Sequence, residues 1–405
     1  MALGFGGGLD RHLGGDDGFH PVAAQRFHWS ADAIPQGKGV TIDMAHKSRL
    51  RTMLAAFNGP QTVGSSPTYW IGFLAVVCLV FAYPFFGENY AVSNNGFLLV
   101  WTFLGLSVCI LWGYTGIFSF GQTAFFGLAG YAYGIMSINV APEYSMLAAL
   151  AAIVVIMLLS AFIGYVIFYG GISSLYIAIF TLMLTLLAET LLNRTSGPTF
   201  TIGQASLGGS NGMVGIPPLQ FGWGDWAVIF VDKPFFWLVA TLLLFVFLGL
   251  RLLLNSNWGY LMVATREDPL RTQLFGYDVR WIQLVTYIIA AGLGGLGGVL
   301  FASWNNFISP ASMGMTAATL PIIWVAAGGR SSILAVVIAT FALQWINQQL
   351  AYSSGQYSLL FFAVLLLVTV MIFPKGIVST VENWISRRQS AAPAPVDHEA
   401  LQGGE

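Results

Sequence analysis

Ten apolar stretches, each close to the length that crosses a lipid bilayer, constrain this chain more than any other feature. A helix needs about 20 predominantly apolar residues to span the hydrocarbon core. The apolar residues run continuously and do not alternate with polar ones, which favours helices over a membrane β-barrel. Glycine and polar residues interrupt the third and eighth stretches. The ten stretches are residues 69–86, 96–114, 121–139, 146–168, 172–193, 234–254, 281–301, 311–328, 332–348 and 357–373. The sequence therefore predicts an all-α polytopic membrane protein.

The composition agrees with this fold class and excludes another kind of partner. Only 8% of the 405 residues are charged and 56% are hydrophobic, whereas a soluble domain carries about 25% charged residues. The formal net charge is −1. Nucleic-acid binding depends on a basic surface, so this balance gives no electrostatic case for it.

The basic residues predict the orientation of the chain. With ten spans both termini lie on one side, and that side then holds all the lysines and arginines except Arg194 and Lys233. Cytoplasmic segments carry the excess of basic residues in membrane proteins. Both termini are thus expected in the cytoplasm, and the long loop at 194–233 is expected outside.

The spans divide the chain into three parts. Residues 1–45 are rich in glycine and contain no apolar core of the kind that a signal peptide carries, and residues 1–66 are expected to form a largely disordered cytoplasmic tail. Residues 67–380 form the predicted membrane domain. Residues 381–405 read as a second cytoplasmic tail.

The longest central cytoplasmic segment, 255–280, carries the signals of a short helix. Asp268 is a good N-cap, Pro269 suits the first helical position, and Gly276 suits the residue after the last turn. These signals predict a two-turn helix over 269–275. Such a short helix is marginal alone and needs a surface to pack on. It is either a docking element for a partner or a solvated connector with good caps.

Four motifs occur in order along the chain: Gly113–Gly127 (GYTGIFSFGQTAFFG), Gly208–Pro218 (GGSNGMVGIPP), Ala264–Gly276 (ATREDPLRTQLFG) and Phe373–Gly376 (FPKG). Together they resemble one family, the branched-chain amino-acid permeases (LivM-type) of ATP-binding-cassette importers, with their urea-importer relatives. The similarity extends over roughly residues 69–380. The 1–66 tail and the bulky pair Phe118 and Phe120 depart from the expected pattern.

This resemblance implies a function, partners and a coupling loop. The chain would be the permease subunit in a bacterial inner membrane, working by alternating access with separate ATPase subunits, a second permease subunit and a periplasmic solute-binding protein. The residues matching the family's ATPase-coupling loop are Arg266, Glu267, Asp268, Pro269, Leu270, Arg271 and Gly276.

Motifs for catalysis and cofactors are missing from the sequence. There is no G-x-x-x-x-G-K-[ST] loop to cradle ATP phosphates. All five histidines lie outside the ten stretches, so no histidine-based metal, haem or triad site is expected within them. We therefore expect a transport subunit with no cofactor and no enzymatic activity of its own.

The break at Gly113–Gln122 is the first candidate for the solute path. Its candidate residues are Gly116, Ser119, Gly121 and Gln122. Interrupted helices build solute sites in many transporters, and irregular backbone is tolerated at membrane depth only inside protein or beside water. The alternative is an ordinary cytoplasmic turn between the second and third spans.

Two further features carry open alternatives. Glu189 is the only acid well inside a predicted span, where ionisable groups are costly. It either lines the path or plays a structural part near the outer interface, for example by pairing with Arg194. Gly294 and Gly298 form a G-x-x-x-G pair, which indicates close helix packing, within the chain or against a second permease.

Other functions and several substrates stay open at this point. A stand-alone secondary transporter or channel for small polar solutes would need no ATPase, and a membrane scaffold or receptor would carry no flux. The resemblance allows branched-chain amino acids, other amino acids, and urea or short amides. The run Ile323–Arg330 (IWVAAGGR) looks more like the urea-type relatives.

Overall fold

The computed structural model describes residues 62, 67–197, 200–222 and 226–354, together with a few positions between 360 and 367. The chain divides into two units, residues 1–49 and 50–405, and every described residue belongs to the second. The 1–66 tail except Thr62, the FPKG segment and the 381–405 tail lie outside the described residues, so the predicted disorder of the first tail is not tested.

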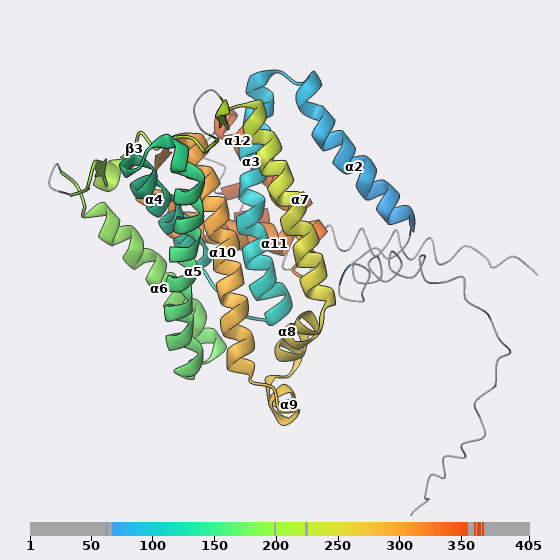
Figure 1. The fold of residues 1–405 in the computed structure, drawn as a ribbon. Helices are drawn as coiled ribbons and strands as arrows, with labels where there is room; N and C mark the ends of the chain where they lie inside the picture. Colours follow the sequence, from blue (N-terminus) through green and yellow to red (C-terminus); the bar gives the residue numbers. More distant parts are fainter. Residues whose placement is uncertain are drawn as a thin grey trace, which may run out of the picture. The chain divides into compact units, whose positions relative to one another are not determined.

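Helices account for nearly all of the described membrane domain (Figure 1). Two of them, α3 and η1, form one continuous helix whose last seven residues take the wider π form. The helices are α2 (Pro67–Phe86), α3 (Asn89–Val108), η1 (Cys109–Thr115), α4 (Gln122–Asn139), η2 (Pro142–Tyr144), α5 (Ser145–Tyr169), α6 (Ser174–Asn193), η3 (Gly209–Asn211), α7 (Lys233–Asn255), α8 (Asn257–Glu267), α9 (Pro269–Leu274), α10 (Val279–Asn305), η5 (Pro310–Met313), α11 (Met315–Gly328) and α12 (Ile333–Ser354).

Within the described residues, seven helices are long and apolar enough to cross a membrane. They correspond to seven of the ten predicted stretches, and this confirms a polytopic helical membrane protein. The two interrupted stretches differ from the other seven. The third forms α4, which does not meet the hydropathy of a full span, and the eighth forms α11, which has only 14 residues. Residues 357–373 lie mostly outside the described residues, so the predicted total of ten is not established.

Short β-strands, which the sequence reading did not predict, form part of the connections at one end of the bundle. They pair as three two-stranded antiparallel sheets: β1 (Thr201–Ile202) with β2 (Ala205–Ser206), β3 (Met213–Val214) with β6 (Phe307–Ile308), and β4 (Gln220–Phe221) with β5 (Val228–Ile229). We call this end the hairpin end and the opposite end, which carries α8 and α9, the α9 end (Figure 1).

The charges sort between these two ends. Arg194 and Lys233 lie at the hairpin end, where α6 ends and α7 begins. The other five described basic residues, which are Arg251, Arg266, Arg271, Arg280 and Arg330, lie toward the α9 end. The described part thus shows the asymmetry on which the predicted orientation depends.

Helix α10 is the centre of the packing. It contacts α3, α4 and α5 along much of its length, and these four helices contribute most of the main core. Gly294 and Gly298 face α4: a Cβ on Gly298 would collide with the carbonyl oxygen of Phe126, and one on Gly294 would lie 3.3 Å from the carbonyl oxygen of Gln122. The G-x-x-x-G pair therefore lets two helices of the same chain approach closely.

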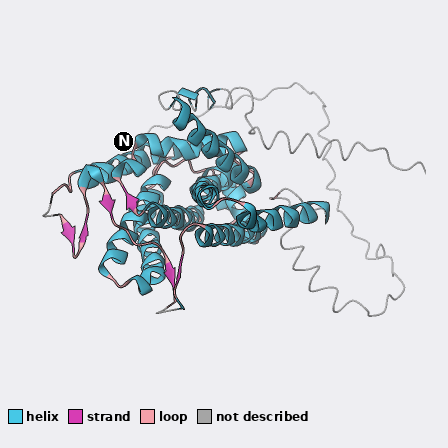
Figure 2. Ribbon diagram, turned by 90° about the horizontal axis from the view of Figure 1, so that it is seen from above, coloured by secondary structure: helices cyan, strands magenta, loops and turns pink. Residues whose placement is uncertain are grey.

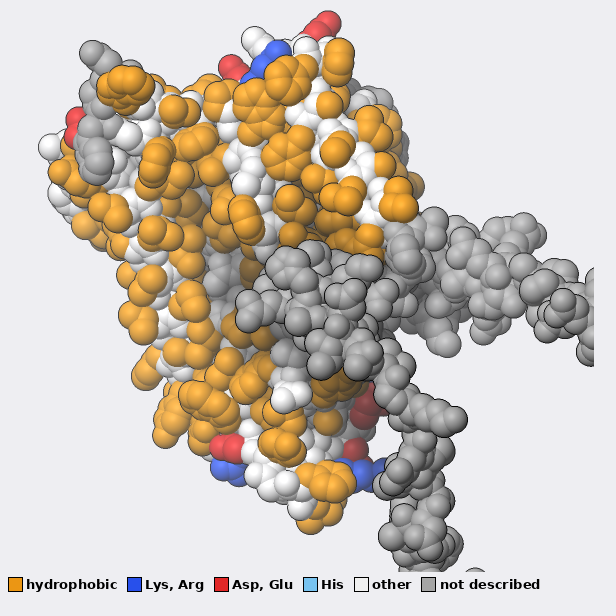
Figure 3. Space-filling view, turned by 45° about the vertical axis from the view of Figure 1, so that its right-hand side comes forward, with side chains coloured by type: hydrophobic (Ala, Val, Ile, Leu, Met, Phe, Trp, Pro, Cys, Tyr) orange, Lys and Arg blue, Asp and Glu red, His pale blue; other side chains and the backbone are white. Residues whose placement is uncertain are grey.

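Helix α2 is held at both of its ends, by Arg251 at its first turn and by Asn95 and Trp237 near its last turn. Only 6% of its span is buried, against 78% for the span formed by α3 and η1. The buried side chain of Arg251 donates a 3.0 Å hydrogen bond to the Tyr69 hydroxyl and lies 4.9 Å from the Trp70 ring centroid. Figure 3 shows one face of the molecule, which is a broad apolar surface with charged side chains at its two ends.

We expect Gly298→Ala to destabilise the protein. The added methyl group meets backbone and not a flexible side chain, and overpacking a close-packed core costs about 1–3 kcal/mol. Gly249→Ala in α7 is the matched control, because nothing lies within 4 Å of its added Cβ. Thermal unfolding of the purified protein in detergent measures both. Equal melting temperatures for the two variants would contradict the packing described here.

Candidate functional site

The connection between α7 and α10 contains the short helix that its caps predict. The carboxylate of Asp268 accepts a 3.0 Å hydrogen bond from the Arg271 N–H, and Pro269 is the first residue of α9. Gly276 has φ of +88°, the left-handed conformation that ends a helix. The sequence reading missed α8, which precedes α9 and turns most of the predicted loop into two helices.

Helix α9 presents apolar side chains at the α9 end of the bundle. Leu270 is 67% exposed, Leu274 79% and Phe275 82%. The only described polar interaction of Arg271 beyond the helix backbone is a 2.9 Å ion pair with Asp268. A six-residue helix with its apolar side chains exposed is unfavourable in water, so this tip has the character of a docking surface.

Arg266 connects α8 to the end of η1. Its Nη1 donates a hydrogen bond to the carbonyl oxygen of Gly113, while its Nη2 lies 2.5 Å from Oε1 of the neighbouring Glu267. Gly116, with φ of +78°, packs directly on this residue, and a Cβ there would lie 2.8 Å from Arg266 Cγ. The guanidinium therefore satisfies a carbonyl that the end of the π-helix leaves open.

The end of η1 is also in contact with the turn between α11 and α12. The Tyr114 hydroxyl donates a 2.8 Å hydrogen bond to the Ser331 carbonyl, and a Cβ on Gly113 would collide with the Arg330 carbonyl oxygen. Short π-helical segments frequently mark functional sites. Here one such segment receives contacts from both the α8–α9 connection and the α11–α12 turn.

The non-helical segment 116–121 leaves this junction and runs into the interior of the protein. It ends at Gln122. The Ser107 hydroxyl lies 2.7 Å from both the Gln122 side-chain oxygen and the Ala290 carbonyl oxygen, and it can donate its hydrogen to either of them. Ala290 lies near the middle of the 27-residue α10. The break therefore begins at the α9 end and reaches half-way along the central helix, so it is more than a turn between two spans.

Helix α6 supplies hydrogen-bond partners to the backbone of this segment. The Phe120 N–H donates to the Thr181 hydroxyl at 3.2 Å, and the Thr185 hydroxyl lies 3.4 Å from the Phe120 carbonyl oxygen. Both threonines are fully buried. The sequence reading missed them, although two threonines four residues apart on an apolar helix place two hydroxyls on one face.

The bulky pair in this segment packs within the protein. The Phe118 ring lies 5.2 Å from the Trp112 ring and 5.3 Å from the Phe120 ring, measured between centroids, and both pairs meet edge to face. These aromatic contacts fix the course of the segment beside η1.

A second interrupted segment enters from the hairpin end. After α10 the chain passes through Asn306, which has φ of +53°, and through η5 before α11 begins. Since α3 and α10 run in opposite directions, the two breaks mirror each other: each follows a long helix and precedes a shorter one. Helix α6 packs on η5 and α11 as well as on α4.

The predicted path residues separate into two places. Gly116, Ser119, Gly121 and Gln122 lie together on the first break. Glu189 lies on α6 beside the second break, where a Cβ on Gly314 would be 2.7 Å from its Oε1. The structure therefore does not bring Glu189 to the first group, and no ion pair between Glu189 and Arg194 is formed among the described residues.

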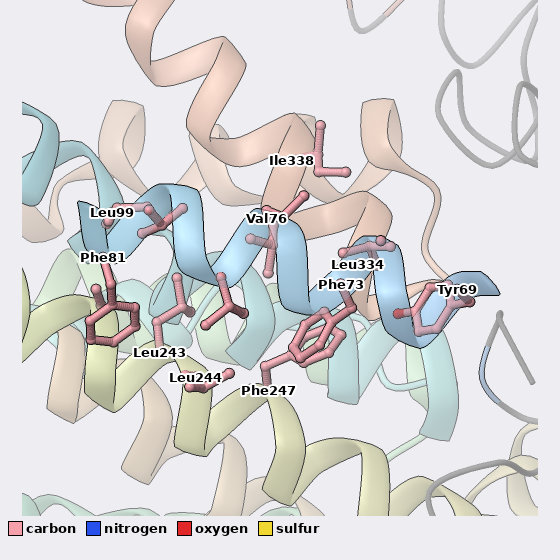
Figure 4. Close-up of a pocket in the computed structure, with 15 residues that line it drawn as sticks. Tyr69, Phe73, Val76, Phe81, Leu99, Leu243, Leu244, Phe247, Leu334 and Ile338 are labelled. Carbon is pink, nitrogen blue, oxygen red and sulfur yellow. The ribbon is translucent and has the colours of Figure 1, made fainter. Parts of the chain in front are cut away.

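Two apolar cavities in the described part lie elsewhere. One of about 480 Å³ lies between α2, α3, α7 and α12, and Figure 4 shows Phe73, Val76, Leu243 and Phe247 lining it. It adjoins a second cavity that shares Val76 and Leu99. Such a lining suits hydrocarbon better than a polar solute. Nor do the described residues contain a group of three or more histidine, cysteine or acidic side chains that would hold a metal ion.

The family model described as branched-chain amino acid transport system / permease component matches residues 95–370. This match covers both breaks and the α8–α9 connection. The chain belongs to this family. No solved structure matches the chain significantly.

Curated relatives agree with this membership. The chain is 25% identical over 366 residues to the high-affinity branched-chain amino acid transport system permease protein LivM of Escherichia coli, covering 84% of this chain and 83% of that protein. It is 25% identical over 340 residues to LivM of Salmonella typhimurium, covering 78% and 77%. A probable LivM of Methanocaldococcus jannaschii is 26% identical over 158 residues, covering 36% and 46%. The chain is thus a multi-pass permease component of a transport system.

We expect Gly116→Ala to lower transport strongly. The substitution adds the strain of a positive φ and pushes the methyl group against Arg266, which moves α8 away from η1. Gly171→Ala is the matched control, because its φ is +72° but nothing lies within 4 Å of its added Cβ. Both variants carry the strain of a positive φ, about 1 kcal/mol, so a loss of uptake in Gly116→Ala alone reports the contact with Arg266. Equal uptake by both would contradict a role for the contact between Gly116 and Arg266.

Proposed function

We propose that this chain is a membrane-spanning subunit of an ATP-binding-cassette importer that carries branched-chain amino acids across the bacterial inner membrane by alternating access. Membership of the permease family carries the proposal. The printed names of the relatives favour branched-chain amino acids. The only feature that favours urea-like solutes is the resemblance of the Ile323–Arg330 run. Its Trp324 is fully buried and meets Trp101 edge to face at 5.8 Å between ring centroids, so this residue serves packing inside the protein.

The energy for import would come from separate ATPase subunits, since the sequence has no phosphate-binding loop. The exposed tip of α9 suits them as a docking surface. The excess of basic residues at the α9 end supports a cytoplasmic position for that end of the bundle. The docking surface would then face the compartment that contains ATP. The hairpin end would then face a periplasmic solute-binding protein, and a second permease subunit would complete the path.

The contacts around the first break suggest how motion passes from the ATPase to the membrane. A displacement of α9 moves α8, and Arg266 transfers it to Gly113 and Gly116. Residues 116–121 then carry it to Phe120, whose backbone is held by Thr181 of α6. In this proposal α6 and the first break move against the close-packed core around α10, and alternate access results.

A reconstitution experiment tests the function. Proteoliposomes would contain this chain with its ATPase subunits and second permease, with the binding protein and labelled leucine outside and ATP inside. We expect leucine uptake that requires ATP and the binding protein, and no comparable uptake of urea. Uptake by this chain alone would overturn the proposal in favour of a stand-alone transporter or channel.

Replacing Leu274 and Phe275 by serine should release the ATPase subunits. Leu274 at the end of α9 and Phe275 directly after it are both more than three-quarters exposed, so their loss removes an apolar contact without disturbing the core. Co-purification of the ATPase with the permease measures the effect. Tyr165→Ser on α5, which is 58% exposed, is the control and should leave the complex intact. Unchanged co-purification of the double variant would show that the ATPase docks elsewhere.

Arg266→Gln should uncouple ATP hydrolysis from import. The shorter neutral side chain leaves the partly buried Gly113 carbonyl without its charged partner, and an unpaired buried group costs about 1–3 kcal/mol, or roughly tenfold in a coupled equilibrium. We expect leucine uptake to fall about tenfold while ATP hydrolysis by the assembled complex continues.

Two further variants separate coupling from simple charge loss. Arg266→Lys keeps the charge but not the planar donor geometry and should fall between the native protein and Arg266→Gln. Arg280→Gln removes an exposed basic residue at the same end and should keep native uptake. Parallel loss of hydrolysis and uptake in Arg266→Gln would indicate failed assembly and contradict the transfer route.

A further inference from the structure

The hairpin formed by β4 and β5 is firmly rooted at the hairpin end. Gln220 pairs with Ile229 and Phe221 with Val228. The Ser145 hydroxyl, at the start of α5, accepts a 2.8 Å hydrogen bond from the Gln220 N–H and lies 3.2 Å from the Gln220 carbonyl oxygen. The Leu219 N–H donates to the Ser303 hydroxyl of α10 at 2.9 Å. The hairpin is therefore a built projection held by two spanning helices.

Beyond this root the hairpin exposes large apolar side chains. Trp226 is 89% exposed and Phe221 66%, and neighbouring Val228, Ile229 and Val231 are each about half exposed, at 48%, 51% and 49%. Consecutive residues of a strand point to opposite faces, so exposure of both Val228 and Ile229 means that both faces of the hairpin are uncovered. Its described residues, 220–222 and 226–231, include no charged side chain. Water alone is a poor environment for such a segment.

The hairpin continues the apolar surface of α5. That helix begins at Ser145, where the hairpin is rooted, and exposes Leu147, Leu150 and Leu158, each at 60% or more. Because α5 is one of the candidate spans, the hairpin lies at the level where a spanning helix leaves the hydrocarbon. Seen from above, the strand pair at the lower edge of Figure 2 projects sideways beyond the helices.

We propose that the β4–β5 hairpin is an interfacial anchor, which places Trp226, Phe221 and Ile229 in the phospholipid headgroup region of the leaflet at the hairpin end. Tryptophan and other aromatic side chains concentrate at this depth because one part of the ring system is apolar and another forms hydrogen bonds. Lipid would surround the hairpin on both faces, which fits the exposure of apolar side chains on both faces. A docked protein would cover only one face of the hairpin. Through Ser145 and Ser303 the anchor would fix the height of α5 and α10 in the bilayer.

Site-directed spin labelling in nanodiscs tests the proposal. The protein would carry Cys78→Ser, which removes an exposed thiol, and the fully buried Cys109 would remain. A nitroxide is then attached at Trp226→Cys or, as an independent site, at Ile229→Cys. Power saturation compares collisions with oxygen, which concentrates in lipid, against collisions with a water-soluble nickel chelate. Gln204→Cys on the exposed β1–β2 turn is the control.

We expect oxygen to relax the labels at 226 and 229 more than nickel does, and the reverse at 204. Nickel accessibility at 226 and 229 equal to that at 204 would overturn the proposal. Labels that are nickel-accessible in the nanodisc and become protected only when a solute-binding protein is added would also overturn it and assign the hairpin to a protein partner. If Trp226→Cys does not fold, Ile229→Cys gives the same readout.

Discussion

Backbone groups that lie inside an apolar layer must find hydrogen-bond partners, and this requirement explains the arrangement around residues 116–121. A regular helix satisfies its own N–H and carbonyl groups, but an extended segment cannot. In this protein the partners come from other elements: Thr181 and Thr185 of α6 hold Phe120, and Arg266 of α8 holds Gly113. These three partners tie the break to elements that are distant in sequence.

The membrane domain has two regions that are held together by different interactions. Around α10, glycines and apolar side chains pack closely, and any displacement there creates voids or collisions. Helix α6 is held differently, through hydrogen bonds to one break and contacts with η5 and α11 next to the other. A hydrogen bond between a side chain and the backbone can be exchanged for another without opening a void, whereas closely packed helices cannot shift in this way. The proposed motion therefore belongs to α6 and the breaks, with α10 as the fixed frame.

Local signals in the sequence predicted much of this, because their physics is local. The caps Asp268, Pro269 and Gly276 placed α9, and the polar and glycine residues of 113–122 marked the break. Contacts between residues that are far apart in the sequence could not be predicted from it. The contact of Arg266 with Gly113 joins residues 153 positions apart, and nothing near Thr181 reveals that its hydroxyl faces Phe120.

The same limit explains the remaining differences from the sequence prediction. The sequence prediction counted 121–139 and 311–328 as spans although glycine and polar residues interrupt them, since hydropathy does not register where an extended segment replaces helix. The strands in the loop after α6 are two residues each, too short for an alternating pattern to appear. Helix α8 is amphipathic and half polar, so it resembled a loop beside the strongly apolar spans.

Transfer of motion from α9 to α6 through Arg266 is the central claim, and a distance measurement tests it most directly. Spin labels would be placed at Gln273→Cys on α9 and Ile179→Cys on α6, both exposed positions, in the assembled transporter with Cys78→Ser. Distances would be compared without nucleotide and with ATP and vanadate. The account predicts a change in the distance distribution that disappears in Arg266→Gln although nucleotide is still trapped. The same change in Arg266→Gln as in the native protein would contradict it.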